Sequence, residues 1–157
     1  MGGPAFDSWC TMMLSLLSQD GVVYIGTVDH RTVNKAYARA GFFLYPTTYQ
    51  ETGCISVLRA MSAGAIPITS RLVESVLNSV TDGLDLGPAT ALNLTTAYNS
   101  TALLHWLSND WMKAVVEAHG MDHSLLQHHR QRMMTFIRTH YTWSNTAACI
   151  TDLFTLA

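Results

Sequence analysis

Two short apolar runs near the middle of the chain are each bounded by residues that interrupt regular structure. Residues 42–45 are apolar throughout and end at a proline, and residues 66–69 form a second run after a glycine and an alanine. Short continuous apolar runs are typical of strands buried on both faces. Residues 54–63 between them contain no helix breaker and precede Gly64, so the pattern predicts a strand, a polar loop, a helix and a strand.

The residues before this segment predict a helix, a strand and a second helix. A stretch rich in Leu and Met, Phe6 to Asp20, has the pattern of one helix. Val22 to Gly26 is apolar and predicts a strand, and a helix is expected to begin near Thr32 with Asp29 as its N-cap. The apolar stripe of that helix is expected to contain Ala36, Tyr37 and Ala40.

The residues after the second apolar run predict mainly helix. Residues 71–80 are expected to form a helix that ends at Thr81-Asp-Gly83, and Leu84 with Leu86 predicts a short final strand. Residues 90–100 are rich in Thr, Ala and Asn and predict a loop. The inward positions of the 71–80 helix are expected to be Leu72, Val73, Val76 and Leu77. Further helices are expected over residues 101–108, 109–118, 123–139 and 142–156.

A strand, a loop and a helix in this order imply a parallel sheet of the α/β class. We therefore expect a partial doubly wound, Rossmann-like parallel sheet with helices on both faces and a helical C-terminal region. The length of 157 residues fits one domain. We expect residues 1–157 to form a single partial domain, with its core in 22–88 and a helical part in 101–157.

Composition narrows the classes of partner. Of the chain's residues, 48% are hydrophobic and only 13% are charged. Apolar surface that is kept for a protein partner would explain this composition. Its formal charge is −2 and no basic stripe is visible, so nucleic acid is not indicated. No apolar run approaches the roughly 20 residues of a membrane span, and the start of the chain lacks the charged region of a signal peptide. The odd, widely spaced Cys10, Cys54 and Cys149 favour a reducing compartment, so we expect a cytoplasmic protein.

Five histidines between residues 119 and 140 raise the possibility of a metal site. His119 and His123 have the spacing that aligns two ligands on one helix face, but Gly120 lies between them and no suitable third ligand is in register. Solvated histidines are the favoured interpretation, so we expect no metal. The other three histidines are His128, His129 and His140.

The polar loop between the strand predicted at residues 42–45 and the helix predicted at residues 54–63 offers a site for a phosphorylated sugar. It is expected at the carboxyl edge of the sheet, where ligands of open α/β folds bind. The first amides of the helix, those of Cys54, Ile55 and Ser56, lack intrahelical partners and suit a diphosphate. Glu51, when ionised, has only acceptor atoms and can take hydrogen bonds from sugar hydroxyls.

Residues 41–70 resemble the donor-binding signature of retaining glycosyltransferases with the GT-B fold, the group 1 family that includes glycogen and sucrose synthases. Pro46 and Thr47 match the opening of that signature, and Glu51 matches its first glutamate. Arg59 stands where the family has a second glutamate. The close of the signature is matched by Ala60, Met61, Ala63, Gly64 and Pro67. Supporting similarities lie in residues 22–29 and in residues 140–143 with the helix that follows.

The resemblance implies the donor-binding half of a retaining, metal-independent hexosyltransferase that takes a UDP-, GDP- or ADP-sugar. Glu51 is then the catalytic-site residue that positions the sugar, and Thr27 with Val28 contacts the base. No further cofactor is expected. The residues expected to bind the donor and its phosphates are Thr47, Thr52, Gly53, Cys54, Ile55 and Arg59.

The resemblance also identifies parts that this chain lacks. The first two strands of the family's donor domain and the whole acceptor domain are missing, so we expect the isolated chain to be inactive and its partner to be that domain or another chain. Arginine has no acceptor and cannot hold a ribose diol as glutamate does, so Arg59 is left with a phosphate role, an ion pair with Glu51 or an altered nucleotide site. The alternatives are a non-catalytic nucleotide-binding or protein-interaction module of the same fold, and a doubly wound domain without a sugar ligand.

Overall fold

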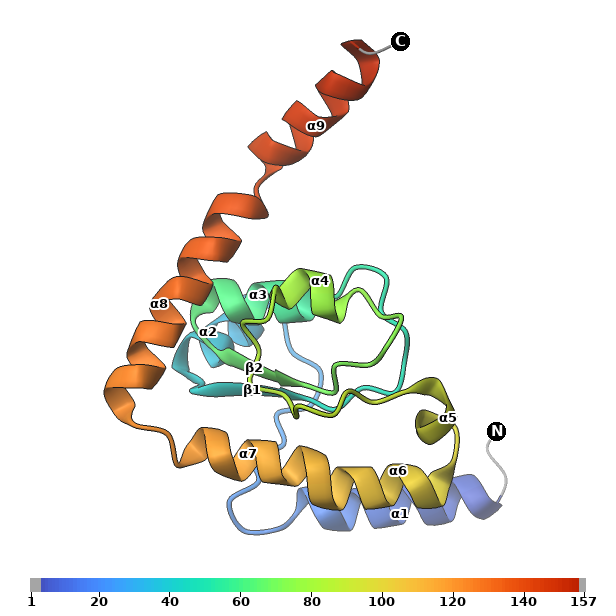
Figure 1. The fold of residues 1–157 in the computed structure, drawn as a ribbon. Coiled ribbons are helices and arrows are strands. Elements are labelled where there is room, and N and C mark those ends of the chain that lie inside the picture. The colour runs from blue at the N-terminus through green and yellow to red at the C-terminus, as the bar shows by residue number, and fades with distance from the viewer. Residues whose placement is uncertain (1–3, 156–157) are drawn as a thin grey trace. The chain divides into compact units, whose positions relative to one another are not determined.

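The computed structural model describes the backbone of residues 4–155 and the side chains of residues 7–151. The chain divides into two compact units, Met1–Val33 and Asn34–Ala157. The sheet and most of the helices belong to the second unit (Figure 1).

The first unit contains helix α1, Pro4–Leu17, which confirms the helix predicted near the start of the chain. The strand predicted at residues 22–26 is wrong, because this segment has no regular structure and exposes its side chains, with Val23 83% and Tyr24 65% accessible. Gly21 and Gly26 flank it with φ values of 83° and 63°. An apolar run becomes a strand only where another strand accepts its backbone hydrogen bonds, and none pairs with it in the described chain.

Helix α2, His30–Arg39, begins as predicted after Asp29. The Thr32 amide donates a hydrogen bond of 2.7 Å to the Asp29 carboxylate, and this contact lowers the pKa of Asp29. Asp29 is therefore confirmed as the N-cap. Of the predicted apolar stripe, Tyr37 and Ala40 are half-buried, whereas Ala36 is exposed.

Strands β1, Phe42–Tyr45, and β2, Ile66–Thr69, pair in parallel with Phe42 opposite Ile66. Helix α3, Ile55–Ala63, connects them, so the predicted order of strand, loop, helix and strand is confirmed (Figure 1). The α/β class and the parallel pairing are confirmed with it. The sheet in the described chain has two strands, and the larger doubly wound arrangement is not seen.

Helices lie on both sides of the two strands (Figure 1). Helices α3 and α4, Leu77–Thr81, lie on one side. Helix α6, Ser100–Trp106, the π-helical turn η1, Leu107–Trp111, and helix α7, Met112–His119, lie on the other. Ile66 packs with the first group and Ile68 with the second, so each set of helices has its own hydrophobic cluster against β2.

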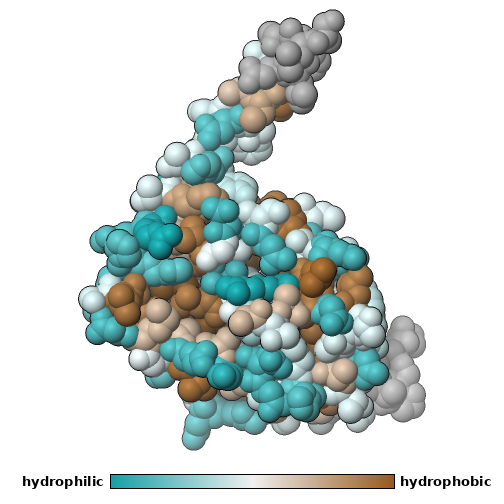
Figure 2. All heavy atoms as spheres, in the orientation of Figure 1, coloured by the Kyte–Doolittle hydropathy of each residue, from teal (hydrophilic) through white to brown (hydrophobic). Residues whose placement is uncertain are grey.

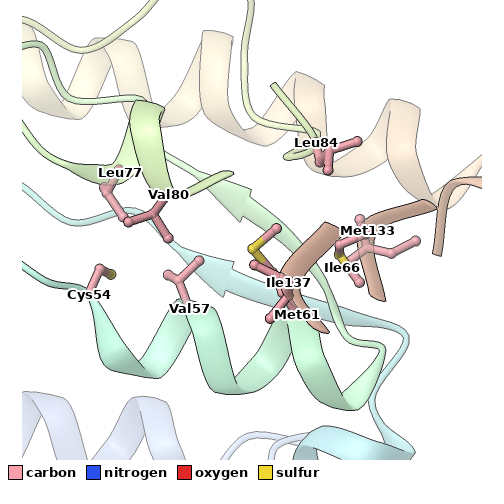
Figure 3. Close-up of a cluster of buried hydrophobic side chains, with 9 residues drawn as sticks. All are labelled: Cys54, Val57, Met61, Ile66, Leu77, Val80, Leu84, Met133 and Ile137. Atoms are coloured by element: carbon pink, nitrogen blue, oxygen red, sulfur yellow. The ribbon is translucent and has the colours of Figure 1, made fainter. Parts of the chain in front are cut away.

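Helix α8, His123–His140, completes the first of these clusters by inserting Met133 and Ile137 (Figure 3). It also covers the end of α3, where Gly64 at φ 98° forms the C-cap and the Arg130 Nε donates to the Gly64 carbonyl at 2.7 Å. A chain segment far along the sequence therefore closes the core of the strand–helix–strand unit. The buried residues of the cluster are Cys54, Val57, Met61, Ile66, Leu77, Val80, Leu84, Met133 and Ile137.

Helix α9, Trp143–Thr155, follows α8 (Figure 1), and its described side chains are exposed (Figure 2). Trp143 is 88% and Ile150 50% accessible. The helices predicted in the C-terminal third are confirmed by α6, α7, α8 and α9. No described helix has the length and apolar character needed to cross a lipid bilayer.

Three predictions between residues 71 and 100 are corrected by the structure. The helix expected over 71–80 is shortened to α4, because Arg71 and Glu74 take left-handed φ values of 48° and 68°; Val73, expected inward, is exposed. Residues 84–86 form no strand, although the Leu86 amide donates to the Pro67 carbonyl of β2 at 2.9 Å. The predicted loop over 90–100 contains a short helix, α5, Leu94–Ala97.

Candidate functional site

The loop from β1 to α3 is held in place through the main chain of Glu51. The Glu51 amide donates to the Ser75 hydroxyl at 3.1 Å, and the Glu51 carbonyl accepts from the Val76 amide at 2.9 Å. Ser75 is only 8% exposed. Both backbone polar groups of Glu51 are therefore satisfied by the segment that follows β2, which fixes the position of its Cα atom.

The Glu51 side chain is held separately by the last residue of β1. The Tyr45 hydroxyl donates a hydrogen bond to Glu51 Oε1. This bond, together with partial burial, raises the pKa of Tyr45 to about 12. The phenol is therefore neutral near pH 7 and remains a donor to the carboxylate.

The start of α3 lies directly after this loop and has no side-chain cap. Cys54 is the N-cap residue, with φ 37° and ψ 50°, and its side chain makes no capping hydrogen bond. The first amides of a helix lack intrahelical acceptors and carry a partial positive charge, so this end can accept an anion. Burial raises the pKa of the Cys54 thiol to about 11, so the thiol is protonated near neutral pH and is not a nucleophile.

Glu51 and the start of α3 open into the same cavity of about 320 Å³. The glutamate is the charged residue of this cavity, and no lysine or arginine lines it. The site therefore combines one carboxylate acceptor with helix amides and three hydroxyl groups, those of Tyr45, Thr52 and Ser56. The lining residues are Tyr45, Glu51, Thr52, Gly53, Cys54, Ile55 and Ser56.

The other residues predicted to bind the donor lie outside this lining. Thr47 supports the loop, because its carbonyl accepts from the Ser70 hydroxyl at 2.7 Å and its hydroxyl from the Tyr49 amide at 3.1 Å. Arg59 lies farther along α3, where a guanidinium nitrogen donates to Asn34 Oδ1 at 2.8 Å. An ion pair between Arg59 and Glu51, one of the three roles left open for Arg59, is not among the salt bridges of the described residues.

The residues predicted to contact the base belong to the first unit. Thr27 is exposed at a bend and Val28 is half-buried in the irregular segment before α2. The strand expected directly before them, at residues 22–26, is not formed. Their role in binding stays a prediction.

Two residues of the site, Tyr45 and Ser75, were not found by sequence reasoning. The apolar pattern assigns Tyr45 to the strand, although a hydroxyl at a strand end six residues before Glu51 is a usable signal. The same kind of pattern places Ser75 inside a continuous helix, and the sequence carries no local signal for its contact with a loop 24 residues earlier.

A larger cavity of about 590 Å³ lies along α8 and shares no residue with the Glu51 cavity. Its polar lining comes mainly from exposed side chains of one helix face, including His128, Arg132 and His140. Within the part of the chain whose side chains are described, no cluster of three His, Cys, Asp or Glu residues is arranged to hold a metal ion.

Comparison with known proteins identifies one family. The model of the family described as glycosyl transferases group 1 matches residues 1–116. None of the curated proteins and none of the solved structures matches the chain. The matched range contains the whole Glu51 cavity.

Proposed function

Because the chain belongs to the group 1 glycosyl transferases, we propose that it is the donor-binding half of a retaining enzyme of the GT-B type. Such an enzyme moves a sugar from a nucleotide diphosphate to an acceptor hydroxyl and keeps the anomeric configuration. The observation that supports this proposal is that the Glu51 carboxylate and the uncapped start of α3 open into one cavity.

Glu51 is the proposed sugar-binding residue of the catalytic site. An ionised carboxylate accepts hydrogen bonds from sugar hydroxyls more strongly than a neutral side chain does. A neutral, hydroxyl-bearing group also suits this position electrostatically, because the lining contains no cation that would offset a phosphate placed beside Glu51.

The diphosphate is proposed to lie at the start of α3, next to Gly53, Cys54 and Ile55. Amides at a helix start are oriented before the reaction and stabilise negative charge that develops on a leaving group. The hydroxyls of Thr52 and Ser56 line the same cavity and add donors. In this proposal the leaving diphosphate is stabilised by these amides and hydroxyls, without a metal ion bound to the chain.

The remaining donor contacts are proposed on the basis of the family resemblance. Thr27 and Val28 would contact the base, Thr47 would bind the donor, and Arg59 would approach a phosphate after leaving Asn34. In this proposal residues 1–157 form one partial nucleotide-sugar-binding domain of a doubly wound fold, and the acceptor domain comes from another part or another chain. We therefore propose that the isolated chain binds a UDP-, GDP- or ADP-sugar without turning it over.

A non-catalytic nucleotide-binding or protein-interaction module is the second candidate. It is favoured by Arg59, which replaces the second glutamate of the signature and donates to Asn34 outside the cavity lining. A site without that glutamate has lost the family's means of holding the ribose diol. Binding that depends on Arg59 rather than Glu51 would support this candidate.

Calorimetry separates these candidates. The full chain is titrated with UDP, GDP and ADP and with the corresponding glucose diphosphates. We expect the Glu51→Gln variant to bind the preferred nucleotide sugar about 10- to 100-fold more weakly, because a hydrogen bond to a charged group contributes about 1.5–3 kcal/mol. Glutamine has the same size and can still accept from Tyr45, so the fold is preserved.

Glu74→Gln is the matched control, because Glu74 is an exposed carboxylate on the neighbouring segment and does not line the cavity. It is expected to bind as the parent chain does. If the folded parent chain binds none of the six compounds, the donor-binding proposal is wrong. If Arg59→Ala abolishes binding and Glu51→Gln leaves it intact, the non-catalytic module is the better account.

A further inference from the structure

We propose that Tyr45 is a positioning residue that orients the Glu51 carboxylate toward the sugar of the donor. This inference rests on the proposed function and adds a residue that the family signature does not contain. Its basis is the hydrogen bond from the Tyr45 hydroxyl to Glu51 Oε1 at the wall of the Glu51 cavity.

Tyr45 is itself held by its surroundings. It is the last residue of β1, opposite Thr69 in the parallel register. Its ring stacks on Phe43 with centroids 5.6 Å apart and an interplanar angle of 16°. Residues two apart on a strand share one face of the sheet, so β1 places both rings together. A hydroxyl on a ring fixed in this way has little freedom to leave its acceptor.

The bond changes what Glu51 can do. A glutamate side chain has three rotatable bonds, and ordering such a side chain at a binding site costs conformational entropy that weakens binding. The Ser75 and Val76 contacts already fix the Glu51 backbone, so the Tyr45 bond is the contact that fixes the carboxylate. Tyr45 takes one acceptor position of Oε1 and leaves the other positions of the carboxylate for the ligand.

In this proposal Tyr45 strengthens binding of the sugar part of the donor and not binding of the nucleotide part. Tyr45 does not precede α3 directly, whereas the amides proposed for the diphosphate belong to the start of that helix. Removing the Tyr45 hydroxyl should leave the phosphate contacts intact and weaken only the contribution of the sugar. The ratio of the Kd for the nucleotide to the Kd for its sugar derivative measures that contribution.

The test is a double-mutant cycle of Tyr45→Phe and Glu51→Gln, measured by calorimetry with UDP and UDP-glucose and with the GDP and ADP pairs. For the preferred pair we expect Tyr45→Phe to lower the sugar-dependent ratio about 3- to 10-fold. Affinity for the nucleotide without sugar should change less than about 2-fold. In the Glu51→Gln background, Tyr45→Phe should lower the ratio much less, since glutamine keeps the hydrogen bond from Tyr45 but no longer offers the sugar a charged acceptor.

Tyr49→Phe is the matched control, because Tyr49 lies on the loop that carries Glu51, is 71% exposed and does not line the cavity. Thermal unfolding followed by circular dichroism checks that each variant is folded. Equal weakening of nucleotide and nucleotide-sugar binding by Tyr45→Phe would indicate a structural role and overturn the inference, as would an unchanged ratio. If the parent chain binds no nucleotide sugar, the proposed function fails, and this inference fails with it.

Discussion

Asp85 forms the centre of the polar contacts beneath the loops that follow β2. It is 3% exposed, and its Oδ1 accepts from Arg71 Nε at 3.0 Å and from the Gly87 amide at 2.7 Å. Its Oδ2 accepts from the Thr81 hydroxyl at 3.0 Å. Arg71 also donates to the Asp85 and Pro88 carbonyls, so one ion pair joins the end of β2 to the chain beyond α4.

The first prediction concerns this ion pair. Arg71→Ala should lower the free energy of unfolding by about 3 kcal/mol, because it leaves the buried Asp85 carboxylate without its cation. Urea unfolding followed by circular dichroism measures the change.

Lys113→Ala provides the control. Lys113 and Glu117 are 3.8 Å apart with side chains 74% and 66% exposed, and such a pair contributes no more than about 0.5 kcal/mol. Equal effects of the two variants would show that burial does not strengthen the Arg71–Asp85 pair.

At the scale of single elements, the start of α8 is capped by a carboxylate that accepts from two backbone amides. The Asp122 carboxylate accepts from the Ser124 amide at 2.8 Å and from the Leu125 amide at 3.3 Å. The hydrogen bonds from Ser124 and Leu125 lower the pKa of Asp122 below its ordinary value. The cap is therefore strongest when Asp122 is ionised.

The second prediction is the pH dependence of this cap. Since the folded pKa is depressed, the stabilisation is fully present above the ordinary value of 3.8 and is lost as the pH falls through the lower folded pKa. Asp122→Ala should lower the urea midpoint at pH 7 and reduce the loss of stability below about pH 4.

Asp122→Asn separates the charge from the hydrogen bond. Asparagine caps helices about as well as aspartate, so this variant should keep most of the stability at pH 7 and lose only the acid-dependent part. Urea midpoints measured from pH 7 to pH 3 distinguish the three proteins. An Asp122→Ala protein as stable as the parent at pH 7 would contradict the importance of this cap.

At the scale of the whole chain, α8 lies beyond the residues that match the family, yet it completes the core next to the site. Met133 is fully buried and packs with Met61 of α3 and Ile66 of β2 (Figure 3). Arg130 and Arg138 of the same helix donate to the carbonyls of Gly64 and Ser62 at the end of α3. The position of α3, and with it the Glu51 cavity, therefore depends on a later part of the chain.

The third prediction follows from this packing. Met133→Ala should lower the free energy of unfolding by about 2–5 kcal/mol, because it removes fully buried methylene groups and leaves a cavity. Removing residues 143–157 should change stability much less, since the described side chains of α9 are exposed. Thermal and urea unfolding of both variants provide the comparison, and a larger loss from the truncation would contradict this account of the core.

Local patterns determined much of the second unit. The apolar runs at 42–45 and 66–69, the helix between them and the later helices all appear in the structure. Each depends on neighbouring residues, namely periodicity and breakers such as Gly64, which ends α3. The same local order placed Glu51 and the start of α3 together, because few residues separate them along the chain.

Predictions that required a distant partner were less successful. The apolar run at 22–26 finds no strand to pair with, and the 71–80 helix is interrupted where Arg71 reaches Asp85. The contacts of Tyr45 and Ser75 with Glu51, and of Arg59 with Asn34, join residues on different elements. The sequence alone thus determined which segments can form helices and strands and which carboxylate lies beside a helix start. Only the tertiary structure decided what holds that carboxylate, because hydrogen bonds between elements depend on their packing and leave no periodic signal along the chain.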